Sequence, residues 1–286
     1  IGIVSVQGGE ITNLTNSGYS SGSPAWAMDG NAILFTSERY GMRNHASWGS
    51  MEDVFLCFVN QDAYDKYRLS KEDYELLKEV EKEQEKLKKG DKKEDAKKDD
   101  KKDEKSSKDI VVELDGIQDR IVRLTPNSSS LGSAIIDKKG ETLYYTASFE
   151  GGMDLWKLNL RKKDVKLANK GVGYASFEMS KDGKNIFLLG GRMQKMDAAS
   201  GKLTPITYHA NLEMDLVAER EAMFNHVYKQ QQKRFYNLNM HGVDWDAMTE
   251  AYRKFLPHIS NNYDYAELLS EWLGELNVSH TGGRYR

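Results

Sequence analysis

Two neighbouring residues near the carboxyl end of the chain, Ser279 and His280, have side chains that could carry acid–base chemistry. An imidazole titrates near neutral pH, so His280 could take a proton from a nucleophile and return it to a leaving amine. Adjacent residues point in different directions, and a nucleophile meets its base in space rather than in sequence. The pair by itself is therefore also compatible with an ordinary loop, or with a glycosylation sequon that begins at Asn277.

The other side chains that could take part in catalysis or bind a metal ion are dispersed along the chain. The remaining histidines show no metal-ligand spacing such as HExxH: His45, His209, His226, His241 and His258. Cys57 is the only cysteine, which excludes an internal disulfide and a zinc site built on several cysteines and fits a reducing compartment. The glycine pairs at 151–152 and 190–191 are interpreted as hairpin or blade-edge turns rather than phosphate loops. We therefore expect no cofactor and no metal ion.

The elements that must position Ser279 and His280 follow a change of period at residue 213. From there apolar residues recur at helical spacing and predict three helices, within 218–236, within 245–256 and after residue 264. Asp244 is expected to cap the second of these helices and Pro257 to stop it.

The third helix has the strongest amphipathic pattern. Its apolar residues recur at one-turn spacing: Tyr265, Leu268, Leu269, Trp272, Leu273 and Leu276. Asp264 and Glu267 resemble a capping box at its start. We expect this helix to end at Asn277, and the Ser-His pair to follow in an extended or turn segment.

Three segments before residue 213 share one pattern, a polar turn that ends in glycine and is followed by a short apolar strand. The turn residues are Gly30, Gly140 and Gly183. Glycine accepts positive φ without penalty, so each segment predicts a hairpin. The spacing of the last two is typical of four-stranded propeller blades, whereas the longer gap between the first two predicts an insertion. Further strands are expected at 53–60, 154–160 and 192–198.

The insertion, at about 62–109, has two parts. Ser70 and Asp73 resemble a capping box at the start of a helix. The helix has a thin apolar face: Tyr74, Leu76, Leu77 and Val80. Residues 91–109 have almost no apolar side chain and cannot bury enough surface to offset the entropy of ordering, so we expect disorder there. This arm is either a solvated loop protruding from a blade or a partner-binding segment, and its mixed charges argue against nucleic acid.

Order is expected to return at residue 109. The segment DIVVELDGIQDRIVRLTPNSSS predicts a strand, a turn at Asp115-Gly116, a second strand and a turn at Pro126-Asn127. It resembles the close of one blade and the start of the next.

The composition of the chain limits the classes of protein and of partner that are possible. The 286-residue chain has a formal net charge of −3 and thus no strong field to attract nucleic acid or an acidic membrane. Only 39% of its residues are hydrophobic, and no apolar run approaches the length of a spanning helix. The chain begins at Ile1 within a strand-like pattern, without a methionine or a signal peptide, so we expect an internal piece of a longer protein and an incomplete ring of blades.

The stretch 241–285 resembles the helical domain of the tricorn proteases, relatives of the tail-specific S41 serine peptidases. The similarity lies in HGVDW and LLSEWLGELNVSH, and the preceding blades resemble the second propeller of that family. The turn SPAWAMDG is similar to TolB-like propeller repeats, whereas the WD40 signature is absent. The expected fold class is multidomain β + α, with a partial β-propeller of TolB/WD40-like blades at 1–212 and a small α-helical domain at 213–286.

The resemblance implies a serine-type peptidase that degrades oligopeptides, with His280 as general base and Ser279 orienting it. It places the nucleophilic serine, a glutamate, the oxyanion-hole amides and a PDZ module in later domains, so this chain alone is expected to be inactive. It further implies a homo-oligomer in the cytoplasm, or in the periplasm if a leader is missing, with no nucleic-acid or membrane partner. The alternative is a non-catalytic propeller that binds a peptide or protein.

Overall fold

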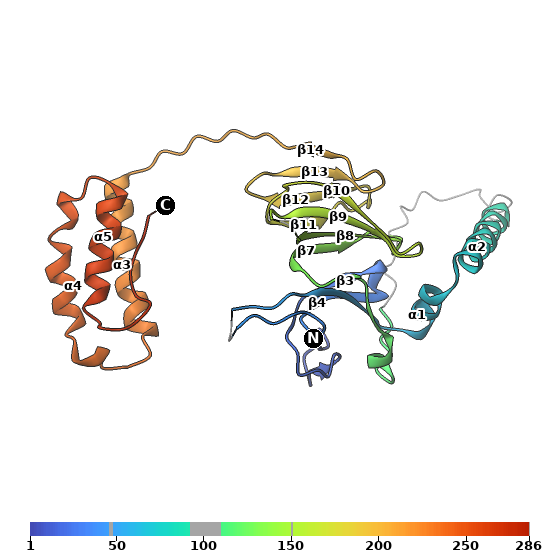
Figure 1. The fold of residues 1–286 in the computed structure, drawn as a ribbon, viewed down its shortest axis with the longest axis horizontal. Helices are drawn as coiled ribbons and strands as arrows, with labels where there is room; N and C mark the ends of the chain where they lie inside the picture. Colours follow the sequence, from blue (N-terminus) through green and yellow to red (C-terminus); the bar gives the residue numbers. More distant parts are fainter. Residues whose placement is uncertain (46–47, 92–109, 150, 286) are drawn as a thin grey trace, which may run out of the picture. The chain divides into compact units, whose positions relative to one another are not determined.

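The computed structural model describes residues 1–45, 48–91, 110–149 and 151–285. The chain divides into two compact units, Ile1–Thr207 and Tyr208–Arg286. The first consists mainly of β-strands and the second of helices (Figure 1). No helix in the described ranges combines the length and the apolar character needed to cross a bilayer.

The first unit contains three antiparallel four-stranded sheets, each a simple meander of consecutive strands. The first sheet has β3 (Ser21–Ala27), β4 (Ala32–Ser37), β5 (Asp53–Phe58) and β6 (Ile121–Arg123). The second has β7 (Ser130–Ile136), β8 (Thr142–Ser148), β9 (Asp154–Asn159) and β10 (Asp164–Asn169). The third has β11 (Ala175–Met179), β12 (Asn185–Gly190), β13 (Gln194–Asp197) and β14 (Leu203–Pro205), and a short pair β1 (Gly2–Ile3) and β2 (Thr12–Asn13) precedes them. These sheets stack as the blades of a partial β-propeller (Figure 1), which confirms the predicted fold class.

The three turn glycines lie where the sequence predicts them, between the first two strands of each blade. Gly30, Gly140 and Gly183 have φ of +86°, +68° and +71°. Two of them also meet the preceding blade: a Cβ on Gly140 would lie 2.6 Å from Cε of Met28, and one on Gly183 would lie 2.7 Å from Cδ of Lys138. Since Met28 and Lys138 occupy the same place in successive repeats, one contact recurs from blade to blade.

The blades bury apolar side chains on both faces. Every residue of β4 and β5 is buried, which is why these strands have nearly continuous apolar sequences rather than strict alternation. One core cluster lies between the first and second blades and includes Leu34, Leu56 and Tyr145. A second, between the second and third blades, includes Tyr144 and Leu188.

The insertion leaves the first blade as two helices, α1 (Gln61–Arg68) and α2 (Lys71–Asp91). The predicted capping box forms in part: the Ser70 hydroxyl accepts a hydrogen bond from the Asp73 N–H at 3.1 Å. The Asp73 carboxylate accepts from the Ser70 hydroxyl at 2.8 Å rather than from the Ser70 N–H. Arg161 of the second blade donates to the carbonyls of Lys66 and Leu69 at 2.7 and 3.0 Å and so secures the end of α1. The predicted disorder of 91–109 lies, apart from residue 91, outside the described residues.

Two predictions are wrong, one within the insertion and one for the segment that follows it. Leu76 and Val80 are exposed, so the apolar face of α2 reduces to the buried Tyr74 and the half-buried Leu77. Residues 110–116 form no strand, although the turn at Gly116 has the expected positive φ of +64°. The reason is the buried guanidinium of Arg120, which donates to the carbonyls of Asp115 and Glu113. The backbone curves around this cation instead of extending along the sheet.

The helical unit contains α3 (Leu216–Arg234), α4 (Trp245–Arg253) and α5 (Asn262–Gly274), joined through short 3-10 turns at Met240–Gly242 and Leu256–His258. Asp244 caps α4 as predicted, accepting from the Ala247 N–H at 3.0 Å. The helix ends at Arg253, before Pro257, which lies within the following 3-10 turn.

The predicted capping box of α5 is wrong. Asn261 is the cap, and its side-chain oxygen accepts from the N–H groups of Tyr263 and Asp264, each at 2.9 Å. Arg220 of α3 fixes this start, since it donates to the carbonyls of Ile259 and Ser260. The helix begins where that anchored loop ends.

The core of the helical unit is an aromatic stack. The ring of the fully buried Trp272 lies 4.1 Å from that of Phe224 and 4.7 Å from that of Trp245, nearly parallel to both. Leu273 and Leu276 complete the buried stripe expected for the third helix. Burial of such side chains contributes roughly 1.5–3 kcal/mol each.

Candidate functional site

Ser279 and His280 lie in an exposed turn that follows α5. The helix itself ends at Gly274, earlier than the expected end at Asn277. Asn277 and His280 both have positive φ, +47° and +65°, a conformation in which Asn and His are over-represented among non-glycine residues. Both side chains of the pair are exposed to solvent.

The segment before the pair is anchored in the core. Leu276 is fully buried, and Val278 is half-buried against the same aromatic cluster that contains Trp272. Side chains in close-packed interiors have little freedom to move. The backbone therefore enters the turn at Ser279 from a fixed position.

The segment after the pair is anchored on α5. The Thr281 hydroxyl donates to the Val278 carbonyl at 3.0 Å and closes the turn. The Ser270 hydroxyl donates to the Gly283 carbonyl at 2.7 Å and accepts from its N–H at 2.9 Å. A Cβ on Gly283 would lie 2.9 Å from Cβ of Leu269, so only glycine permits this approach. Gly283 thus packs tightly on the helix.

The side chains of the pair make no hydrogen bond with one another or with any other described residue. The bond by which Ser279 would orient the imidazole is therefore not formed in this structure. Both side chains are exposed, so they are accessible to a group that approaches from outside the described chain.

A shallow groove of about 460 Å³ borders the turn. Ser279 lies in its wall, opposite the last turn of α3. The lining residues are Gln230, Gln231, Arg234, Phe235, Tyr236, Val278, Ser279 and Thr281. The groove thus offers side-chain amides, a guanidinium and aromatic rings beside the candidate serine.

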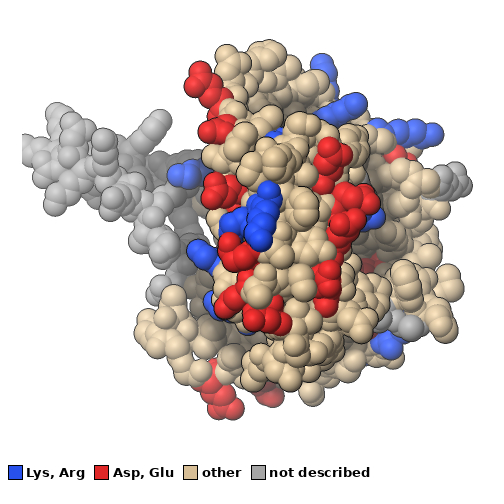
Figure 2. Space-filling view, turned by 90° about the vertical axis from the view of Figure 1, so that its left-hand side faces the viewer, with Lys and Arg blue, Asp and Glu red and all other residues tan. Residues whose placement is uncertain are grey.

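The carboxylate that directly follows α5 already has a partner. Glu275 accepts a hydrogen bond from the Tyr252 hydroxyl at 2.9 Å, and burial together with this bond raises the pKa of Tyr252 to about 12. Elsewhere, α4 and α5 expose Asp246, Glu250 and Glu271. On the face of the helical unit turned toward the viewer in Figure 2, acidic side chains gather in groups with few basic ones among them.

The remaining histidines do not join His280. His45 and His209 belong to loops, and His226 and His258 are exposed on α3 and on the 3-10 turn after α4. The described residues hold no group of three or more His, Cys, Asp or Glu side chains placed to bind a metal ion.

His241 is different, because its ring reaches the end of α5. Its Nδ1 lies 2.9 Å from the carbonyl oxygen of Leu276, just before the Ser-His turn. No spacing rule in the sequence signals this contact, since it joins two segments that are far apart along the chain.

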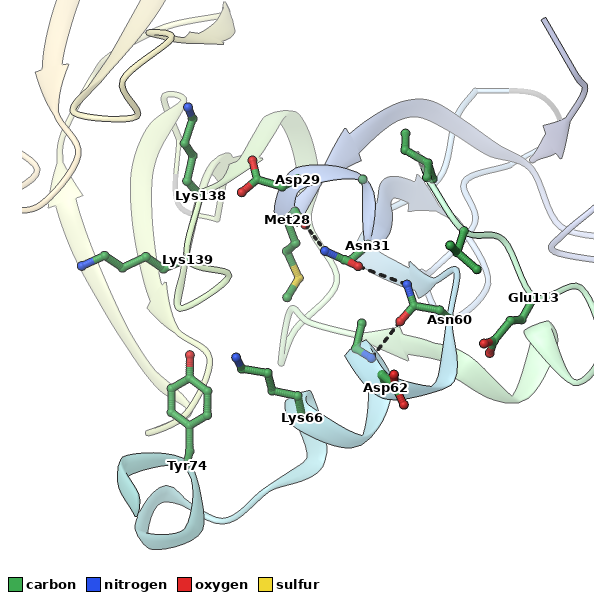
Figure 3. A pocket seen from close by; sticks show the side chains of 14 residues that line it. Met28, Asp29, Asn31, Asn60, Asp62, Lys66, Tyr74, Glu113, Lys138 and Lys139 are labelled. Atoms are coloured by element: carbon green, nitrogen blue, oxygen red, sulfur yellow. Dashed lines mark hydrogen bonds between the residues drawn. The ribbon is translucent and has the colours of Figure 1, made fainter. Parts of the chain in front are cut away.

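A larger hollow, of about 560 Å³, lies in the propeller unit (Figure 3). Its lining residues include Lys66 of α1 and the adjacent Lys138 and Lys139 of the turn between β7 and β8. The side chain of Asn60, which lines the hollow, already makes two hydrogen bonds within the protein. It donates to the Asn31 side chain at 3.1 Å and caps α1 by accepting from the Ala63 N–H at 2.9 Å. We assign this hollow to the attachment of the insertion, since none of the candidate site residues lines it.

The comparisons with known proteins agree with this architecture. Residues 216–274 match the family described as the Tricorn protease C1 domain. The chain is 27% identical to tricorn protease homolog 1 of Streptomyces coelicolor over 59% of its own length and 18% of the relative. It is 24% identical to a tricorn-like protease C-terminal subunit of Sulfurisphaera tokodaii over 62% of its length and 22% of the relative. Among solved structures, the crystal structure of the tricorn protease superposes with a TM-score of 0.63 at 12% identity, covering 99% of this chain and 27% of that one.

The fold is thus that of a propeller-bearing protein whose blades are followed by a helical domain of peptidase type. The chain is tricorn-like: its helical unit matches the tricorn protease C1 domain, and the propeller and helices together share the tricorn protease fold. It spans about a fifth of the length of the curated relatives it matches.

Proposed function

We propose that this chain supplies the general base of a serine-type peptidase of the S41 class that degrades oligopeptides. His280 is the base and Ser279 the residue that orients it. The nucleophilic serine, a glutamate and the oxyanion-hole amides come from outside this chain, so the chain alone is inactive. The propeller acts as a gate or filter for substrate.

One observation carries the proposal: the Ser-His turn is exposed yet anchored on both sides. Leu276 fixes its entry in the core, and the bonds between Ser270 and Gly283 fix its exit. Catalytic groups must be held within narrow tolerances by residues that are themselves fixed by packing and hydrogen bonds. An ordinary surface loop would need neither anchor.

The proton path follows from the two side chains. As the nucleophilic hydroxyl attacks the peptide carbonyl, its proton passes to one ring nitrogen of His280. The imidazolium then returns that proton to the departing amine as the carbon–nitrogen bond breaks. Ser279 accepts a hydrogen bond from the second ring nitrogen and so selects the tautomer whose first nitrogen is free to accept.

The test replaces His280 in the full-length protein. His280→Asn suits the left-handed backbone at this position but provides no base, so peptide turnover should fall by about 100- to 10,000-fold. The matched control is His226→Asn, on the exposed surface of α3, which should retain normal turnover. Unchanged turnover in His280→Asn would remove this residue from the mechanism and favour the non-catalytic propeller.

Ser279→Ala should reduce turnover less than His280→Asn, because it alters orientation only. Peptide binding, measured separately by calorimetry, should survive both substitutions. Loss of binding with no loss of turnover per bound peptide would contradict the assigned roles.

A further inference from the structure

His241 links the connection between α3 and α4 to the segment that leaves α5. Its Nδ1 lies 2.9 Å from the Leu276 carbonyl oxygen, and its Nε2 is hydrogen-bonded to the hydroxyl of Tyr236. The rings of Phe235 and Tyr236 each lie 5.3 Å from the imidazole and meet it edge-on. The ring is therefore held by two polar contacts and two aromatic neighbours.

The partners define the tautomer of His241. A backbone carbonyl can only accept, so Nδ1 must carry the proton that it donates to Leu276. In the neutral ring Nε2 is then an acceptor, and the Tyr236 hydroxyl donates to it. Both nitrogens are engaged, so His241 is arranged to hold structure rather than to transfer a proton.

The carbonyl that His241 binds lies directly before the chain changes direction toward Ser279. Leu276 lies beyond the last helical residue, Gly274, where helix-end carbonyls lack partners within the helix. The next residue, Asn277, has a φ of +47°, so the chain changes direction immediately after the bonded peptide. The orientation of the peptide group between Leu276 and Asn277 thus sets the direction in which the backbone approaches Ser279.

The backbone at His241 is itself unusual. Met240 and His241 have φ of +51° and +58°, and Gly242 follows with +85°. Consecutive non-glycine residues in the left-handed region persist only where the surrounding structure determines them. Here that conformation directs the imidazole toward the end of α5.

We propose that His241 is a positioning residue for the Ser279-His280 turn; this rests on the proposed function. By donating to Leu276 it fixes the peptide plane from which the turn departs, and so fixes the imidazole of His280. His241 touches neither side chain of the pair and has no part in proton transfer.

Two variants of the full-length protein separate positioning from packing. His241→Phe keeps an aromatic ring against Phe235 but removes both hydrogen bonds. His241→Asn places an amide N–H near the position of Nδ1 and suits the left-handed backbone. The control is His226→Phe, on the exposed surface of α3.

We expect kcat to fall about ten- to a hundredfold in His241→Phe, because misplacement of a catalytic group by about 1 Å can lower the rate by about a hundredfold. KM should change by less than about twofold. His241→Asn should recover most of kcat. Amide hydrogen exchange at 277–280 should be faster in His241→Phe and close to normal in His241→Asn.

Normal kcat and normal exchange in His241→Phe would overturn the inference. Equal losses in both variants, without rescue by Asn, would overturn it as well and indicate a packing role. Failure of the proposed function is seen differently, as unchanged turnover in His280→Asn, whatever the exchange at 277–280 shows.

Discussion

The hydroxyl of Ser270 holds both backbone polar groups of Gly283, donating to its carbonyl at 2.7 Å and accepting from its N–H at 2.9 Å. One side chain of α5 thereby secures the chain on the far side of the Ser-His turn. We expect Ser270→Ala to lower the free energy of unfolding of the helical unit by about 1–3 kcal/mol, since each bond contributes about 0.5–1.5 kcal/mol.

Urea denaturation followed by far-UV circular dichroism measures this loss, and amide exchange at Gly283 should become faster. Ser260→Ala, in an exposed loop of the same unit, is the control and should change neither quantity. A slow amide at Gly283 in Ser270→Ala would show that packing against Leu269 holds the tail without the hydroxyl.

Two adjacent glycines at the end of β12 should respond differently to substitution. A Cβ on Gly190 would lie 2.5 Å from the Tyr174 carbonyl oxygen and 3.2 Å from Cα of Ala175, whereas one on Gly191 would meet nothing within 4 Å. Backbone cannot yield as a flexible side chain can, so Gly190→Ala should cost about 1–3 kcal/mol. Gly191→Ala should stay within about 0.5 kcal/mol of the parent. Thermal unfolding of the propeller unit compares them, and similar melting temperatures would refute the tight approach of β11 to β12.

Two carboxylates of the first blade should give opposite pH dependence. Burial, and then the nearby Glu38 carboxylate, raise the pKa of Glu52 above its ordinary value of 4.5. Ionised Glu52 is therefore disfavoured in the folded state; this cost is absent well below pH 4.5, grows as pH rises through the folded pKa and is complete at neutral pH. Glu52→Gln should raise the melting temperature at pH 7 and lose that advantage in acid.

The hydrogen bond from Ser50 is the main cause that lowers the pKa of Glu38 below 4.5. Its stabilising contribution is present above pH 4.5 and is lost as pH falls through the lower, folded pKa, so Glu38→Gln should be destabilising at pH 7. Glu10→Gln, on an exposed loop, is the control. Shifts of the same sign in both variants would contradict the assigned causes.

Local patterns carried much of the fold. The turn glycines, the cap at Asp244 and the apolar stripe of α5 are each specified by a few neighbouring residues, and the sequence predicts all three. The outer strands β10 and β14 were not predicted, because β14 has only three residues and the alternation in β10 is limited to Val165 and Leu167.

The missed features depend on side chains that arrive from distant segments. Arg220 sets the start of α5, and Arg120 bends a segment that has the composition of a strand. The contact between His241 and Leu276 belongs to the same kind. Ser279 and His280 could be proposed from a resemblance, but the anchors around them are visible only in the folded chain.

The aromatic stack should control the stability of the helical unit. Trp272 is fully buried between Phe224 and Trp245, so Trp272→Ala should cost about 3–5 kcal/mol. The indole N–H of Trp272 is buried without a hydrogen-bond partner among the described residues, so Trp272→Phe keeps a ring in the stack and also removes an unpaired donor. We expect Trp272→Phe to cost far less free energy of unfolding than Trp272→Ala.

The control Trp48→Ala removes an indole that is 81% exposed and should be close to neutral. Urea midpoints followed by far-UV circular dichroism rank the three, and equal losses for Ala and Phe at Trp272 would show that the stack itself contributes little.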